Sequence, residues 1–297
     1  MNGENSAMGR LHPVPALIYL LSVIFITMFS PAPVILSLSL VGGALFCASV
    51  QSAKQTRSDI GFYLPLFVLI AVTNPLFSHD GVTPLFFMNG NPVTLEALLY
   101  GVDIAAMMIS VLIWCKCFSI IITTDKTLYL LGGVLPKLSL VLSISLRYIP
   151  LMKKKWRQIK DAQIAMGYYS ESGFTAKLMS SARVFSALVT WSLENAVNIG
   201  ASMKARGYGA TKRTHFSLFR FTVADGVFTF AAIALAGAAF IGMWRGKFDF
   251  SFYPRMADTD LSFEGICFYV LFAVLVFIPF IFEVTEAVKW KYLRSKI

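Results

Sequence analysis

The 297-residue chain is 57% hydrophobic and only 14% charged, so it is more apolar than an ordinary water-soluble domain. Its formal net charge of +10 does not indicate nucleic-acid binding, because much of the positive charge lies in one middle segment between apolar runs. A basic cytoplasmic face beside anionic lipid accounts for this distribution. The composition therefore predicts an all-α integral membrane protein.

Six apolar runs predict about six transmembrane helices. Between the third and fourth runs, Asn89-Gly90 is a strong tight-turn signal and predicts a small exposed hairpin. Glu96 and Asp103 fall in the first half of the fourth run. They are either functional intramembrane acids or, as we favour, acids near the outer interface or facing neighbouring helices. The six runs are residues 14–29, 34–50, 60–77, 95–121, 221–244 and 266–282.

The long middle segment, residues 150–207, is too polar to span a bilayer comfortably and predicts long amphipathic helices. Apolar residues recur every three or four positions in both of its halves. Such helices usually lie on an anionic membrane surface or in a groove of a partner protein. Pro150 suits the first turn of the first helix, and Gly167 and Gly207 suit the two helix ends, where a positive φ is needed. The preceding apolar stretch, residues 128–146, is expected to be a further helix of this region.

The distribution of Lys and Arg predicts the topology. With a cytoplasmic N-terminus, the basic loop at 51–59, the middle segment and the C-terminal tail all lie inside. A crossing by residues 184–203 would bury Glu194 at mid-depth, which costs at least about 2–3 kcal/mol. It would also make the number of membrane crossings odd instead of even. We therefore expect a multi-pass protein of the cell membrane with both termini in the cytoplasm. The expected division is 1–121 for transmembrane helices 1–4, 122–220 for cytoplasmic coupling helices and 221–297 for transmembrane helices 5–6.

No catalytic motif is recognisable: the chain has no GxxxxGK[ST] phosphate loop, no HExxH and no nucleophile triad. We therefore predict a non-catalytic protein that binds no cofactor or metal, and any ATP that drives transport must be hydrolysed on another subunit. Arg206 lies in the last turn of the second amphipathic helix, where its guanidinium can reach a carboxylate or carbonyls of a docked partner. The alternative is that Arg206 complements the helix dipole while Gly207 caps the helix.

Three stretches of the middle segment carry a family resemblance. They are Leu146-Arg147-Tyr148-Ile149-Pro150, then Ala162-Gln163 leading to Ala165-Met166-Gly167, and Ser202-Met203-Lys204-Ala205-Arg206-Gly207-Tyr208. Together they resemble the T component of energy-coupling factor (ECF) importers, the CbiQ/EcfT family.

The resemblance implies a transmembrane scaffold of an ABC-type importer for a vitamin or a metal ion. Its coupling helices would dock on two cytoplasmic ABC ATPase subunits, which bind ATP and magnesium. A small membrane-embedded S component would capture the substrate and pack against the scaffold within the lipid. The implied ATPase-docking residues are Ala165, Met166, Gly167, Ala205, Arg206 and Gly207, and the implied structural residues of the coupling region are Arg147, Pro150, Ala162 and Gln163.

The chain departs from the family pattern at one position, because Met166 stands where an arginine is expected. Three explanations are open: one ATPase is held by hydrophobic contact, a neighbour such as Lys160 or Arg183 substitutes, or coupling is weaker at this end. A competing hypothesis is a stand-alone membrane protein whose basic amphipathic helices bind lipid or a signalling partner. That hypothesis predicts no ATPase partner. The substrate is not identified by any residue, since S components carry that choice in the family.

Overall fold

The computed structural model describes residues 6–78, 81–88, 91–168, 173–210, 219–253, 256 and 262–294. The chain divides into two compact units, which we call the membrane unit (Met1–Thr127 with Phe219–Ile297) and the paired-helix unit (Leu128–Leu218). The elements are α1 (Ala7–Arg10), α2 (Pro13–Phe29), α3 (Pro33–Val50), α4 (Ala53–Phe77), β1 (Pro84–Met88), β2 (Asn91–Thr94), α5 (Leu95–Ile121), α6 (Thr124–Val134), α7 (Pro136–Ala165), α8 (Phe174–Ala205), α9 (Val223–Trp244) and α10 (Phe263–Arg294).

Five of these helices, α3, α4, α5, α9 and α10, are long and apolar enough to cross a membrane, and α2 is a shorter apolar helix. They coincide with the six predicted runs, so the all-α membrane fold is confirmed. Neither α7 nor α8 is among them. Two bounds were predicted too short: α4 begins at Ala53 rather than 60, and α10 continues to Arg294 rather than ending at 282. The apolar run marks only the part of a helix that meets lipid, while the backbone hydrogen bonds continue beyond it.

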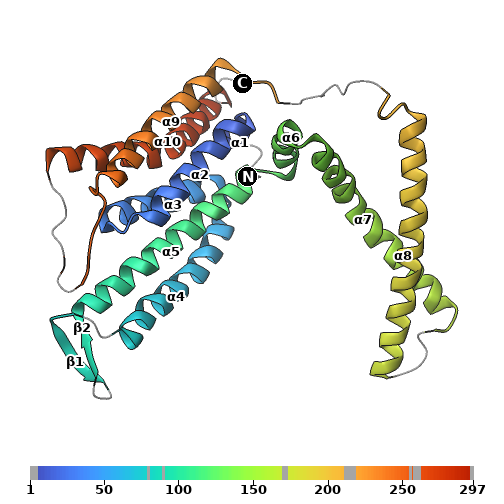
Figure 1. Ribbon diagram of the computed structural model, residues 1–297, viewed down its shortest axis with the longest axis horizontal. Coiled ribbons are helices and arrows are strands. Elements are labelled where there is room, and N and C mark those ends of the chain that lie inside the picture. The colour runs from blue at the N-terminus through green and yellow to red at the C-terminus, as the bar shows by residue number, and fades with distance from the viewer. Residues whose placement is uncertain are drawn as a thin grey trace. The chain divides into compact units, whose positions relative to one another are not determined.

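The membrane unit is a ring of five helices with a sixth outside it. α5 packs on α3, α3 on α10, α10 on α9, α9 on α2, and α2 back on α5, whereas α4 packs mainly on α5. Figure 1 shows these helices running side by side. α4 is accordingly the least buried of the five long apolar helices.

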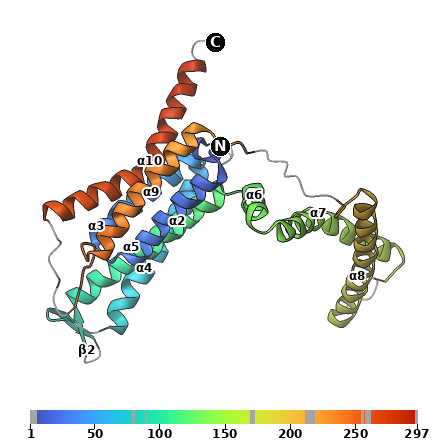
Figure 2. The same cartoon turned by 45° about the horizontal axis from the view of Figure 1, so that its top comes forward.

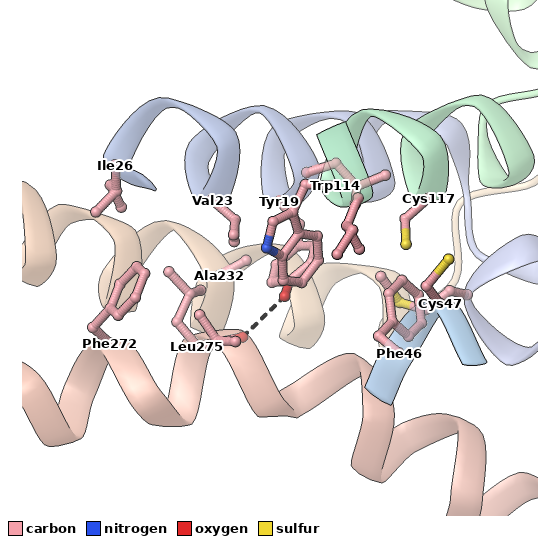
Figure 3. Close-up of a cluster of buried hydrophobic side chains, with 14 of the residues drawn as sticks. Tyr19, Val23, Ile26, Phe46, Cys47, Trp114, Cys117, Ala232, Phe272 and Leu275 are labelled. Atoms are coloured by element: carbon pink, nitrogen blue, oxygen red, sulfur yellow. Dashed lines mark hydrogen bonds between the residues drawn. The ribbon is translucent and has the colours of Figure 1, made fainter. Parts of the chain in front are cut away.

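Large aromatic side chains fill the centre of the ring. Tyr19 of α2, Phe46 of α3 and Trp114 of α5 are fully buried together with Leu275 of α10 (Figure 3). Tyr19 Oη donates a hydrogen bond to the Leu275 carbonyl at 3.0 Å, which satisfies its hydroxyl inside the apolar core. Trp114 packs at 6.1 Å from Phe46 and 6.3 Å from Tyr19, between ring centroids, so one residue joins three helices.

A small polar cluster joins α2, α3 and α5 beside this core. Ser39 Oγ lies 2.7 Å from Thr27 Oγ1, accepts from Ser110 Oγ at 2.8 Å and accepts from Trp114 Nε1 at 3.0 Å. All four residues are buried. Because lipid offers no hydrogen bonds, such interhelical bonds hold membrane helices together and fix their register.

The hairpin before α5 is antiparallel, with Met88 opposite Asn91, so the predicted hairpin is confirmed, while its Asn89-Gly90 turn lies outside the described residues. Glu96 accepts a hydrogen bond from Thr83 Oγ1 at 2.7 Å and thereby ties the hairpin to α5. Asp103 is buried inside the bundle. Glu96 thus has a structural partner at the hairpin, whereas the burial of Asp103 fits either interpretation, because functional intramembrane acids also face the bundle interior.

The second half of α10 holds the N-terminal helix. Glu283 Oε2 accepts from the Ala7 backbone N–H at 2.8 Å, which caps the start of α1. Arg10 pairs with Glu286 at 2.7 Å and lies 5.6 Å from the ring centroid of Trp290. Pro279 lies inside α10, and Figure 2 shows this helix changing direction along its length, as the loss of one backbone hydrogen bond allows.

Candidate docking site

The paired-helix unit is built from α7 and α8, which pack on each other and cross in Figure 1. Our placement of Pro150 in the first turn was wrong, since Pro136 occupies that position and Pro150 lies in the interior of α7. A proline there removes the hydrogen bond to the Leu146 carbonyl but keeps a helical φ. The apolar stretch before Pro150 and the basic stretch after it therefore form one 30-residue helix.

Aromatic and polar side chains hold the crossing of the two helices. Asn195 of α8 donates a hydrogen bond from Nδ2 to Tyr148 Oη of α7. The Tyr148 and Trp191 rings lie 6.2 Å apart, and Lys155 Nζ lies 5.5 Å from the Trp191 ring centroid. Arg147 and Pro150 flank Tyr148 and are exposed. The crossing thus uses side chains that the resemblance did not assign, although their aromatic character is visible in the sequence.

The two helices end in the same way. α7 ends Ala165-Met166-Gly167-Tyr168, and α8 ends Ala205-Arg206-Gly207-Tyr208. Met166 has φ −80° and ψ 1°, Arg206 has φ −82° and ψ 7°, and the following glycine has φ +81° in both. In each case the glycine N–H bonds three residues back and the tyrosine N–H bonds five residues back, at 3.0–3.1 Å. This is the Schellman geometry, and the predicted roles of Gly167 and Gly207 as helix ends are confirmed.

Both ends present their side chains to the surroundings. Met166 is 63% exposed, Tyr168 is 51% exposed and Tyr208 is 47% exposed. Arg206 is likewise exposed, as are Ala162, Ala165 and Ala205. Gln163 differs from these, because it is buried and its Oε1 accepts no hydrogen bond within the described part of the chain.

The structure does not bring the two ends together. The end of α7 lies against the beginning of α8, where Ser180 Oγ donates to the Tyr168 carbonyl at 2.8 Å. Arg206 comes 26 residues (206 − 180) after Ser180 in one helix, which corresponds to about 39 Å at 1.5 Å per residue. Each end is therefore a separate surface that a separate partner could contact.

An apolar stripe along α8 is left open between the two ends. Phe174 is 83% exposed, Leu178 is 61% exposed and Phe185 is 60% exposed, whereas Val184 and Leu188 are buried. The predicted apolar period is thus present, but much of the stripe is not covered by the described residues. Exposed apolar surface of this extent marks a binding surface for a protein or a membrane.

The chain is similar to a known protein family and to several named proteins. The family model described as "CbiQ: Cobalt transport protein" matches residues 4–216. The energy-coupling factor transporter transmembrane protein EcfT of Brevibacillus brevis is 24% identical over 82% of this chain and 99% of its own length. EcfT of Listeria innocua is 27% identical over 59% of this chain and 72% of its own length.

A third relative has a different name. An ABC transporter ATP-binding protein of Bifidobacterium longum is 26% identical to this chain over 254 residues. The match covers 80% of this chain but only 32% of that relative, so the chain spans about a third of the relative's length.

Proposed function

The chain belongs to the CbiQ family of cobalt transport proteins, and from this membership we propose that it couples ATP hydrolysis on partner subunits to substrate uptake. In this proposal it is the transmembrane scaffold of an ECF-type importer. Two cytoplasmic ABC ATPases bind ATP and magnesium, and a membrane-embedded S component carries a vitamin or a metal ion. The scaffold itself performs no chemistry, and both of its termini lie in the cytoplasm.

The pair of like helix ends is the observation that carries this proposal. Each end exposes the same backbone geometry and a tyrosine, and about 39 Å of α8 separates them. Two ATPases can therefore each receive one end. Force applied at either end would pass into the α7–α8 crossing, which Tyr148 and Asn195 hold together.

The relative from Bifidobacterium longum supports an ATPase partner. About two thirds of that polypeptide lies outside the match to this chain, and its name refers to ATP binding. A scaffold and an ATP-binding segment joined in one polypeptide act on each other at high effective concentration. We infer that this chain likewise acts together with ABC ATPases.

A test begins with the full-length tagged chain, purified in mild detergent from the cells in which it occurs. ATP hydrolysis per mole of tagged chain is measured in the eluate. Arg206→Ala should lower this activity about tenfold or more, because a hydrogen bond to a charged group contributes about 1.5–3 kcal/mol. Arg157→Ala is the matched control, since Arg157 is an exposed arginine of α7 away from both ends.

One outcome would contradict the proposal, and a second would contradict the role of Arg206 in it. If the wild-type eluate hydrolyses no ATP while the reconstituted chain binds anionic vesicles, the stand-alone lipid-binding hypothesis replaces it. If Arg206→Ala retains wild-type activity at an equal amount in the membrane, Arg206 does not dock the ATPase.

A further inference from the structure

We infer that Arg183 supplies, at the end of α7, the guanidinium that Arg206 supplies at the end of α8. The inference rests on the proposed function, because the partner at each end is an ATPase subunit. Both helices end in the pattern Ala-x-Gly-Tyr, but the variable position is Met166 in α7 and Arg206 in α8. The inference names the residue that supplies the positive charge at the α7 end. The first end is then assembled from two helices, whereas the second is formed by one.

The two ends can be compared within the chain itself. Met166 and Arg206 have backbone angles that agree within a few degrees and are followed by a glycine with the same φ of +81°. Tyr168 and Tyr208 therefore occupy corresponding positions beside their helices. The two ends differ in the charge at the position before the glycine, so a partner that binds the Arg206 guanidinium at one end meets no cation at position 166 of the other.

Arg183 lies where such a cation is needed. Its Cζ lies 4.9 Å from the Tyr168 ring centroid. Ser180, one turn earlier on α8, donates to the Tyr168 carbonyl at 2.8 Å and fixes this part of α8 against the end of α7. Lys160, a second cation near this end, precedes Met166 by six residues, which places its backbone about 9 Å back along α7. Among the residues that the structure describes, Arg183 is thus a cation that contacts the α7 end directly.

The contact leaves Arg183 able to bind a partner. A guanidinium stacks on an aromatic ring through its face, while its N–H donors lie along its edge. Arg183 is exposed, and no carboxylate pairs with it among the residues that the structure describes. It can therefore donate to a carboxylate or to backbone carbonyls of the ATPase, and the exposed Met166 of the same helix end adds an apolar side chain. Tyr168 orients the guanidinium before the partner arrives.

The experiment uses the same full-length tagged chain and ATP-hydrolysis measurement, with Arg206→Ala run in parallel. Arg183→Ala should lower co-purified ATP hydrolysis about tenfold, as Arg206→Ala does, and the double variant should lower it further because the ends are separate. Arg157→Ala should have no effect. The decisive variant is Met166→Arg added to Arg183→Ala, which should restore most of the activity by placing the guanidinium directly on α7.

The outcomes separate this inference from the proposed function. If Arg206→Ala lowers activity but Arg183→Ala does not, Arg183 is not the docking cation, while the scaffold function stands. If Arg183→Ala lowers the melting temperature of the chain and Met166→Arg fails to restore activity, Arg183 only packs on Tyr168 and the inference is overturned. If no ATP hydrolysis co-purifies with the wild-type chain, the proposed function itself is refuted.

Discussion

Gly101 lets α5 approach α4 closely, and Gly101→Ala tests that contact. A methyl group at Gly101 would lie 2.5 Å from the carbonyl oxygen of Ala71 and 3.1 Å from Asn74 Cβ. A carbon and a carbonyl oxygen in contact are normally about 3.3 Å apart or more, so the two helices must separate by about 0.8 Å. The Ala71 carbonyl belongs to the helix backbone and cannot rotate away as a side chain could.

The cost follows from this displacement. Forcing an extra methyl group into a packed interior costs about 1–3 kcal/mol, and alanine returns up to about 1 kcal/mol through its better helix propensity. The separation also strains the 2.9 Å hydrogen bond from Asn74 Nδ2 to the Ala97 carbonyl. We expect a net loss of about 1–2 kcal/mol for Gly101→Ala, since the strain of this bond opposes the gain in propensity.

Gly237→Ala is the matched control, because Gly237 also lies in a membrane-crossing helix, α9, and a methyl group there meets nothing within 4 Å. We expect Gly237→Ala to be neutral or slightly stabilising. The assay is thermal unfolding of the purified chain in detergent, followed by size-exclusion chromatography of the fraction that remains monodisperse. Gly101→Ala should lower the midpoint by a few degrees relative to Gly237→Ala. Equal midpoints for the two variants would refute the close contact between α4 and α5.

Three further predictions concern single residues. Gly207→Val should reduce co-purified ATP hydrolysis, because a β-branched residue at φ +81° costs about 1–3 kcal/mol and distorts the end of α8, whereas Gly200→Ala should not. Lys126→Met should raise the unfolding midpoint, since Lys126 is buried, its amine has no hydrogen-bond partner among the described residues, and burial lowers its pKa. His12 Nδ1 accepts from the Val14 N–H at 3.4 Å, and burial lowers the pKa of His12 below 6.5. Stability should therefore fall as the pH drops through about 6.5, and His12→Gln should weaken this fall in pH-dependent unfolding.

Each of these three predictions would be contradicted by one specific result. Unchanged hydrolysis in Gly207→Val would show that the left-handed glycine is not needed for docking. A lower midpoint for Lys126→Met would mean that the attraction between Lys126 and Asp225 outweighs the cost of the buried amine. A midpoint that is flat or rises between pH 7.5 and 5.5 in the wild type would mean that Asp225, which raises the pKa of His12, dominates over burial.

The sequence was sufficient for the membrane helices because lipid imposes one simple requirement on them. A segment that crosses the bilayer must be apolar for about 20 residues, and six runs meet or approach that length. The order of packing was not predictable, since α3 and α4 are both apolar, yet α3 lies in the ring and α4 outside it. Partners such as Tyr19 with Leu275, or Ser39 with Ser110, are far apart in the chain and carry no local signal.

The difference between local and non-local contacts also decides which features of the candidate site could be predicted from the sequence. The ends at Gly167 and Gly207 were predictable because a left-handed residue is a requirement of the local backbone. Pro150 misled the prediction, since a proline suits a first turn but is also tolerated inside a helix whose flanking turns are held by packing. The contact of Arg183 with Tyr168 depends on how α8 packs against the end of α7, so no spacing rule could select it. A position that breaks a family pattern in sequence can therefore keep the chemistry of that pattern, if the fold brings the missing group from a neighbouring helix.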